Sequence, residues 1–174
     1  MKKIIIGAVV LALAIGVFFI YKKMPVPSVP VVADGYKNTT YEIDGRNVTL
    51  TNGRAEEEIV PGSDSKLVTQ YFGNEVRGDL NADGREDVAF LITQSGGGSG
   101  TFYSVVVALG AGDSYIGTNS VFLGDRIAPQ TTEIHDGKLV VNYADRAPGE
   151  PMTVQPSVGI STYLEVHEGQ LVKI

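Results

Sequence analysis

The most specific chemical pattern in the chain is an acidic loop near its middle. It runs Asp-Leu-Asn-Ala-Asp-Gly-Arg-Glu-Asp from Asp79 to Asp87, with oxygen side chains at positions 1, 3, 5 and 9 and glycine at position 6. Alternate side chains of a curled loop can all point inward, and a hard cation such as calcium needs about six to eight oxygens. Gly84 permits the sharp turn between them. We therefore predict a calcium site formed by Asp79, Asn81, Asp83, the backbone carbonyl of Arg85, and Asp87.

The surroundings of this loop separate it from an EF-hand. An EF-hand needs a bidentate Glu at position 12 and a helix on each side, whereas position 12 here is Phe90 and the run 88–92 is apolar and β-branched. The stretch Gly78 to Leu91 resembles instead the calcium loop of the FG-GAP repeats of integrin-type propellers, which leads into a strand. One copy does not make a propeller, so the resemblance does not extend to that fold. The spacing of the four oxygen side chains and the glycine predicts an ion site with a structural role and an affinity on the order of 10⁻⁴ to 10⁻³ M, as in extracellular modules. The alternative is a solvated turn that binds nothing tightly.

Three other features could carry chemistry. The loop Gly96–Gly100 could hold an anion with backbone amides, but it lacks the lysine of a phosphate-binding loop, which favours a plain hairpin connection. The two histidines, His135 and His167, each precede an acidic residue and a glycine, which is typical of turns. Arg126 and Arg146 each follow an aspartate at a strand end, where they form either structural ion pairs or one wall of a polar groove with Tyr143.

The elements that position these residues are predicted to be strands. Short apolar alternating runs are separated by Asp44-Gly45, Asn52-Gly53, Pro61-Gly62, Asp136-Gly137 and Glu168-Gly169, all of which favour tight turns. The run 66–72 is expected as a further strand, although 63–72 could instead form a short helix, and 115–123 is expected as one strand. We predict an all-β antiparallel meander, closed as a sandwich or a partly open barrel. Its expected core comprises Phe90, Ile92, Val105, Val107, Leu109, Leu139, Val141 and Leu164.

The first residues predict a membrane anchor. Ile4 to Ile20 is 17 residues without a polar or charged side chain, and as a helix it would be roughly 25 Å long. Lysines flank it on both sides, so the positive-inside rule hardly decides its orientation. We expect an N-terminus inside and a domain outside, as in a signal anchor. The alternatives are a signal peptide cleaved after Ala33 and a buried core helix.

The chain is thus predicted to contain an anchor over 1–23, a proline-rich linker over 24–35 and a β-rich extracytoplasmic domain over 36–174. All 20 acidic residues follow the anchor, together with only 10 of the 14 basic ones. Such an acidic domain excludes non-specific nucleic-acid binding. The lack of cysteine excludes thiolate metal sites, cysteine nucleophiles and a lipidated cysteine.

Several segments spread along the chain, taken together, also resemble a known group of sequences. They include Val48-Thr49-Leu50-Thr51-Asn52-Gly53, Gly78-Asp79-Leu80-Asn81-Ala82-Asp83-Gly84, Gly97-Gly98-Ser99-Gly100-Thr101-Phe102-Tyr103 and Leu123-Gly124-Asp125-Arg126. These segments, within residues 39–174, resemble an uncharacterised family of small bacterial exported proteins and lipoproteins. The resemblance implies a cell-envelope location and brings no activity.

The sequence therefore predicts a single-pass membrane protein with a calcium-ordered β-domain outside the cytoplasm, acting as a binding or scaffolding protein of the cell envelope. The membrane is contacted through residues 4–20. An envelope enzyme or enzyme inhibitor is the alternative, with the Gly96–Gly100 loop or the Arg126/Arg146 region as its working surface.

Overall fold

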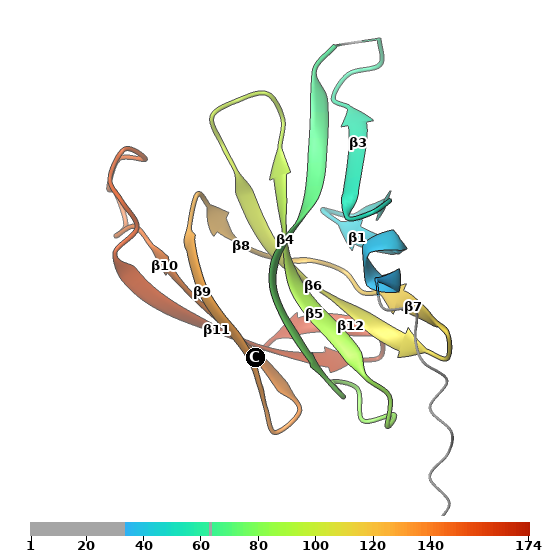
Figure 1. Cartoon of the computed structure of the whole chain (residues 1–174). Helices are drawn as coiled ribbons and strands as arrows, with labels where there is room; N and C mark the ends of the chain where they lie inside the picture. The colour runs from blue at the N-terminus through green and yellow to red at the C-terminus, as the bar shows by residue number, and fades with distance from the viewer. Residues whose placement is uncertain (1–33, 63) are drawn as a thin grey trace, which may run out of the picture.

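The computed structural model describes residues 34–62 and 64–174, and Figure 1 shows that they form an almost entirely β structure. All strand pairs between named strands are antiparallel, which confirms the predicted all-β antiparallel class. The expected membrane anchor and the linker up to Ala33 lie outside the described residues. The elements are η1 (Gly35–Asn38), β1 (Thr40–Ile43), β2 (Arg46–Thr49), β3 (Arg54–Glu58), β4 (Lys66–Gly78), β5 (Asp87–Ser95), β6 (Phe102–Ala111), β7 (Ser114–Gly117), β8 (Val121–Asp125), β9 (Ala128–His135), β10 (Lys138–Asp145), β11 (Val158–His167) and β12 (Gln170–Lys173).

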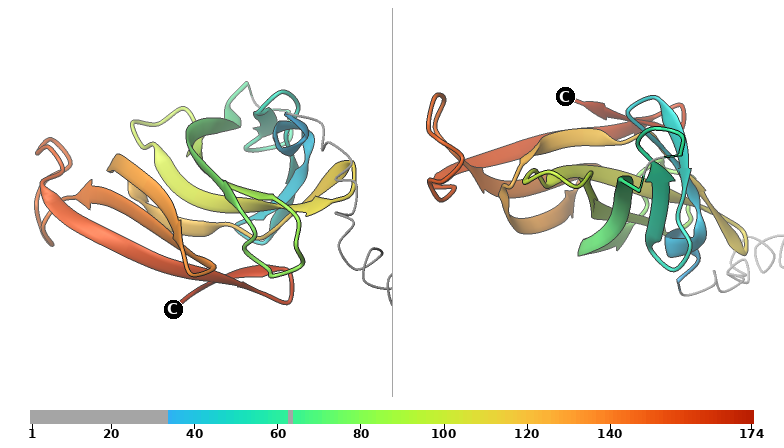
Figure 2. Two further views of the ribbon diagram at one scale, coloured as in Figure 1. Left: turned by 60° about the horizontal axis from the view of Figure 1, so that its bottom comes forward. Right: turned by 90° about the horizontal axis from the view of Figure 1, so that it is seen from above.

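Two sheets form the body of the domain. The larger has the order β3-β4-β5-β6-β7, with β8 also paired to β6, and the smaller has the order β12-β11-β10-β9. Seen from above, the two sheets lie as separate layers (Figure 2). Leu91, Val105 and Val107 from the large sheet meet Leu139, Val141 and Leu164 from the small one in a shared apolar cluster. Because all eight expected core residues are buried, that prediction is confirmed.

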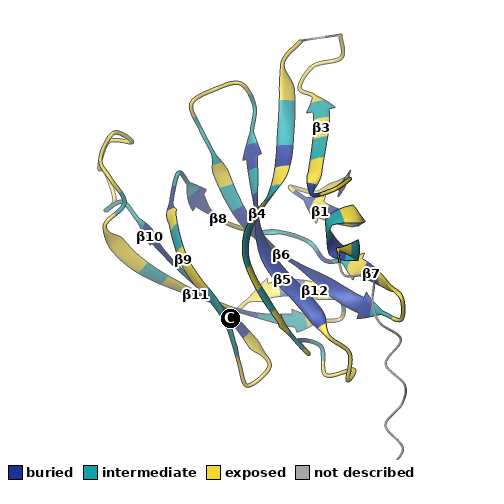
Figure 3. Ribbon diagram, in the orientation of Figure 1, coloured by how far each residue is buried: buried dark blue, intermediate teal, exposed yellow. Residues whose placement is uncertain are grey.

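The second face of the large sheet is also covered. Successive side chains of a strand point to opposite faces, so Phe90 and Ile92 point away from the small sheet. They pack instead under the β1–β2 hairpin and η1, against Tyr36 and Tyr41 in a second cluster. Strands β5 and β6 are therefore buried on both faces, as their continuous dark colour in Figure 3 shows.

The dipeptide turn signals are placed where the sequence predicts them. Asp44-Gly45 joins β1 to β2, Asp136-Gly137 joins β9 to β10, and Glu168-Gly169 joins β11 to β12. In each pair both residues have a positive φ, the backbone shape that the tightest hairpin turns require. These turns set the register of three hairpins.

The expected strand over 66–72 is confirmed, and the helix considered over 63–72 is wrong for these residues. They begin the long strand β4, in which Thr69 and Tyr71 face inward while β3 and β5 hydrogen-bond to both edges of the strand. One expected strand is wrong in its extent. The expected single strand over 115–123 is divided into β7 and β8. Between them the backbone of Thr118 and Ser120 hydrogen-bonds with Glu42 of β1.

Within residues 34–62 and 64–174, no helix has the length and apolar character needed to cross a membrane.

Candidate functional site

The acidic loop connects β4 to β5 and is closed by its own side chains. The two carboxylate oxygens of Asp79 accept hydrogen bonds from the Asp83 N–H at 3.2 Å and the Gly84 N–H at 2.9 Å. The chain can curl this tightly because Ala82 and Gly84 have φ values of 61° and 82°, a region that glycine enters without steric cost. The loop is therefore bent around its first aspartate.

The next two oxygen side chains lie within the same turn. The Asn81 Oδ1 accepts from the Asp83 N–H at 3.1 Å, and the Asp83 Oδ1 accepts from the Arg85 N–H at 2.9 Å. The Arg85 guanidinium lies 3.6 Å from the other Asp83 oxygen, and both side chains are partly exposed. In the part of the chain that the structure describes, no group of three or more His, Cys, Asp or Glu side chains has the arrangement of a metal site. The loop thus brings Asp79, Asn81 and Asp83 together, and its oxygens bond backbone N–H groups.

Asp87 differs from the other predicted ligands because it is buried. Its carboxylate accepts from the Leu80 N–H at 2.8 Å and from the Gly110 N–H at 2.9 Å. Burial raises the pKa of Asp87 above its usual value, the two backbone hydrogen bonds lower it, and the nearby charges of Asp83 and Asp79 raise it further. The last acidic residue of the loop therefore fastens both ends of the loop to the large sheet.

The approach of the loop to β6 depends on a glycine. A Cβ atom on Gly110 would lie 2.6 Å from the backbone oxygen of Glu86, closer than unbonded atoms can pack. Sequence reasoning did not identify Gly110, since nothing in its spacing distinguishes it from the other 20 glycines of the chain.

A second polar cluster links the loop to the start of the domain. Arg77 bonds Glu86 at 3.2 Å and lies 3.6 Å from Glu75. The other oxygen of Glu75 accepts from the hydroxyls of Tyr36 at 2.6 Å and Tyr71 at 2.9 Å. The hydrogen bond from Tyr36 is the main reason that the pKa of Glu75 lies below its usual value. This cluster holds η1, which carries Tyr36, onto the large sheet.

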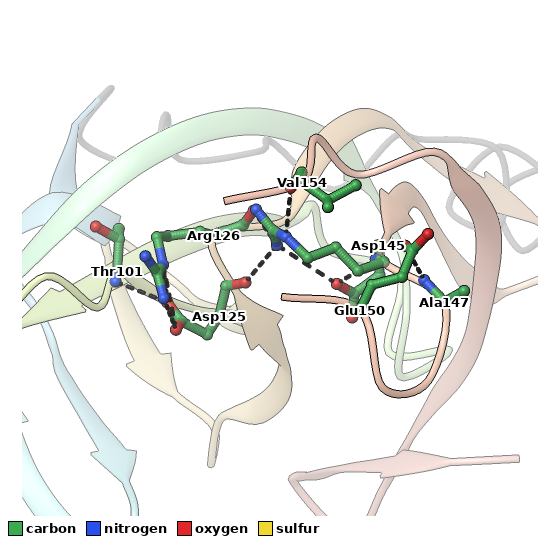
Figure 4. A network of polar contacts seen from close by, with 8 residues as sticks. Thr101, Asp125, Arg126, Asp145, Ala147, Glu150 and Val154 are labelled. Atoms are coloured by element: carbon green, nitrogen blue, oxygen red, sulfur yellow. Dashed lines mark hydrogen bonds and ion pairs between the residues drawn. The ribbon is translucent and has the colours of Figure 1, made fainter. Parts of the chain in front are cut away.

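The Arg126/Arg146 region is a structural network rather than an open groove (Figure 4). Arg126 bonds the adjacent Asp125 at 3.0 Å, and Asp125 also accepts from the Thr101 N–H. The Arg146 side chain is only 9 % exposed and donates to the backbone oxygens of Arg126 and Val154. The third residue of the expected groove, Tyr143, is buried in the core between the sheets.

The remaining candidates do not gather catalytic groups. His135 is exposed and bonds Glu133, and His167 is the last residue of β11 before a turn. Among the described residues, neither histidine is hydrogen-bonded to a serine, threonine or tyrosine hydroxyl. A Cβ atom on Gly96 would lie 3.2 Å from the Ile59 side chain, and one on Gly100 would lie 2.9 Å from the Phe102 ring, so neighbouring side chains closely approach both glycines. Beside this glycine-rich loop lies an open hollow of about 370 Å³ whose lining includes only two charged residues; it is lined by Asp44, Arg46, Leu67, Gln94, Phe102, Ser104 and Phe122.

No family model, curated protein or solved structure matches this chain.

Proposed function

We propose that this chain is a membrane-anchored extracytoplasmic β-module of the cell envelope, in which the loop Asp79–Asp87 binds calcium and the domain acts as a binding or scaffolding protein. The proposal combines the apolar run 4–20 of the sequence with the geometry of the acidic loop. The calcium would have a structural role, because its candidate ligands lie where β4 passes into the central strand β5.

The observation that carries the calcium proposal is the convergence of Asp79, Asn81 and Asp83 within one closed turn. Each of these side chains still has oxygen lone pairs available, because a carboxylate or amide oxygen can accept more than one contact. Backbone N–H groups already hold Asp79 and Asp83 in place, which lowers the entropy lost when an ion is bound. Asp87 supplies a further negative charge nearby and couples the loop to β6.

The calcium proposal is tested by thermal unfolding of the full chain in detergent. Calcium is titrated well beyond about 1 mM, which is the weak end of the expected affinity range. We expect the melting temperature to rise with calcium, and Asp83→Ala to abolish the rise. Asp113→Ala is the matched control, because Asp113 is an exposed aspartate in the turn between β6 and β7. A wild-type chain whose melting temperature does not respond to calcium, or an Asp83→Ala variant that responds equally, would refute the ion site.

The membrane proposal is tested on the same chain by extraction at alkaline pH. An inserted helix stays with the bilayer under these conditions, whereas a peripherally bound protein is released. Leu11→Arg places a charge at the middle of the apolar run, where it makes membrane insertion less favourable by about 3 kcal/mol. We expect the wild-type chain in the membrane fraction and a large part of the variant in the soluble fraction. Protease added to intact cells should reach the β-domain if it lies outside.

A further inference from the structure

The face of the large sheet that carries the second apolar cluster is covered only in part. Phe90 and Ile92 of β5 lie under the β1–β2 hairpin and η1. Gln94 continues the same face of β5, because side chains two positions apart share a face. On β6, Ser104 lies opposite Ile92 and Phe102 lies opposite Gln94. In Figure 3 the dark colour of β5 and β6 gives way to lighter colours toward their connection, beyond the part that the hairpin covers.

The open hollow of about 370 Å³ lies over this end of the sheet. Residues from four strands of the large sheet form most of its lining: Leu67, Gln94, Phe102, Ser104 and Phe122. Asp44 and Arg46, at the tip of the β1–β2 hairpin, form its rim. Sites for small molecules usually have volumes of roughly 300–1,000 Å³. The hollow is thus large enough for a small ligand.

Two exposed aromatic rings form one wall of the hollow. Phe102 is 45 % exposed and Phe122 is 58 % exposed, and their ring centroids are 6.5 Å apart. A Cβ atom on Gly100 would lie 2.9 Å from the Phe102 ring, so this ring rests against the backbone of the glycine-rich loop. Rings held in water in this way can gain free energy from contact with the apolar surface of a ligand.

The floor of the hollow is polar, and part of it is unpaired. Ser104 is only 7 % exposed, and within residues 34–62 and 64–174 its hydroxyl has no hydrogen-bond partner. This oxygen is not fully enclosed, because in the same ranges the one fully enclosed unpaired side-chain atom belongs to Thr132. The buried Gln94 donates from Nε2 to Thr69 at 3.1 Å, which leaves its carboxamide oxygen free to accept. The hollow therefore offers a hydroxyl and an amide oxygen to a ligand.

The charges around the hollow argue against an anionic ligand. Arg46 is the one cationic residue of the lining, where it is accompanied by Asp44. Its guanidinium also lies 3.7 Å from the carboxylate of Glu57. A phosphate or carboxylate would thus meet more negative than positive charge in this part of the described structure.

The polar floor argues equally against a wholly apolar ligand. An acyl chain in the hollow would cover the Ser104 hydroxyl and the Gln94 carboxamide without hydrogen-bonding to them, and buried polar groups without partners are destabilising. A ligand that satisfies both the rings and the floor has apolar C–H surface on one side and neutral hydrogen-bonding groups on the other.

We propose that the hollow binds a neutral saccharide. The C–H groups of a sugar ring pack on Phe102 and Phe122, because the face of an aromatic ring carries partial negative charge. Sugar hydroxyls, which both donate and accept, bond the Ser104 hydroxyl and the Gln94 carboxamide oxygen. This proposal rests on the binding role proposed above and names its ligand class, but it requires neither calcium nor the membrane anchor.

Binding is tested by saturation-transfer NMR of the full chain in lipid nanodiscs, which keep sugar-based detergents out of the sample. Irradiation in the aromatic region saturates the protein and not the lipid. The probes are maltotetraose, cellotetraose, xylotetraose and chitotetraose at millimolar concentration. We expect transfer to at least one of them, strongest at the ring C–H protons, because these protons contact the phenylalanine rings. Absence of transfer to every probe would overturn the proposal.

Two substitutions connect the signal with the hollow. Phe122→Ala removes the more exposed ring and should weaken the affinity about tenfold, as for the loss of one contact residue. Ser104→Ala removes a hydroxyl that is unpaired among the described residues, so it should leave the melting temperature unchanged and weaken the affinity about three- to tenfold. Phe72→Ala is the matched control, because Phe72 is equally an exposed phenylalanine but contacts Tyr103 outside the hollow. Its affinity should equal that of the wild-type chain.

Two further results would contradict a saccharide site in the hollow. The first is an affinity that neither Phe122→Ala nor Ser104→Ala reduces, or that Phe72→Ala reduces equally. The second is transfer to octanoate or tetraalanine and to none of the saccharides, which would assign the hollow to an acyl chain or a peptide. The response of the melting temperature to calcium is recorded on the same samples. Failure of the calcium site and failure of the saccharide site are therefore observed separately.

Discussion

The carboxylate of Asp87 accepts a hydrogen bond from the backbone N–H of Gly110 at 2.9 Å, although the two residues are 23 positions apart. Its second oxygen accepts from the Leu80 N–H at 2.8 Å. One buried side chain thereby joins the start of β5, the start of the acidic loop and the end of β6. The loop is fastened to the sheet by an aspartate that the sequence pattern assigns to the ion.

Asp87→Ala should therefore destabilise the domain even without calcium. The change leaves two buried N–H groups without their acceptor, and each such group costs about 1–3 kcal/mol. We expect the free energy of unfolding to fall by about 2–4 kcal/mol in total, measured by urea unfolding in the presence of a calcium chelator. Asp113→Ala, at an exposed turn, should change it by less than about 0.5 kcal/mol. Equal stability of the two variants would show that the Asp87 contacts contribute nothing.

Gly110→Ala tests the close approach of the acidic loop to β6. The added methyl group would lie 2.6 Å from the Glu86 oxygen, so the loop must move away. We expect a loss of about 1–3 kcal/mol, as for other overpacked sites, together with weaker calcium binding. The matched control is Gly159→Ala in β11, where a Cβ would meet nothing within 4 Å. In that strand the substitution should leave the free energy of unfolding unchanged or slightly higher, because alanine loses less backbone entropy than glycine on folding.

The contrast between Asp87 and Asp136 explains what the sequence could and could not predict. Asp136 with Gly137 forms a turn whose shape is decided by the two residues themselves, so the sequence located that hairpin correctly. The environment of Asp87 is decided by Gly110 on another strand. No local pattern contains that information, because the pairing of distant strands creates it.

The same distinction applies to the cores. The cluster between the two sheets was predicted from strongly apolar runs, since Val105, Val107 and Val141 alternate or cluster in an obvious way. The second cluster was only partly anticipated, because Tyr36 precedes the first strand and lies in a short 3₁₀ helix. Its position depends on the hydroxyl contact with Glu75 in β4. A tyrosine 39 residues away from its partner gives no periodic signal.

Asn119→Ala tests the link between the connection of β7 to β8 and the small sheet. The Asn119 side chain both accepts from the Leu171 N–H at 2.7 Å and donates to the Leu171 oxygen at 3.0 Å, as a neighbouring strand would. Its loss leaves both backbone groups of a buried residue without these partners, and should cost about 1–3 kcal/mol. Hydrogen exchange of the Leu171 amide should accelerate in step. Asn47→Ala, at an exposed position of β2, serves as the control and should leave that amide unchanged.

Alkaline titration should detect the attachment of η1 to the large sheet through Tyr36. Burial raises the pKa of the Tyr36 hydroxyl to about 12 from the ordinary value of 10.0, and its hydrogen bond to Glu75 adds to the rise. Because the pKa is higher in the folded chain than in the unfolded one, the stability from this hydroxyl is fully present below pH 10. It is lost as the pH rises through about 12.

The phenolate absorbance of the wild-type chain minus that of Tyr36→Phe isolates this titration from the other seven tyrosines. Glu75→Gln removes the negative charge beside the hydroxyl, so the pKa of Tyr36 should fall. It should nevertheless stay above 10.0, because burial is the larger cause and the variant retains it. A Tyr36 that titrates at its ordinary pKa in the folded wild-type chain would mean that η1 separates from the sheet in solution. A pKa unchanged by Glu75→Gln would mean that the 2.6 Å contact does not hold it there.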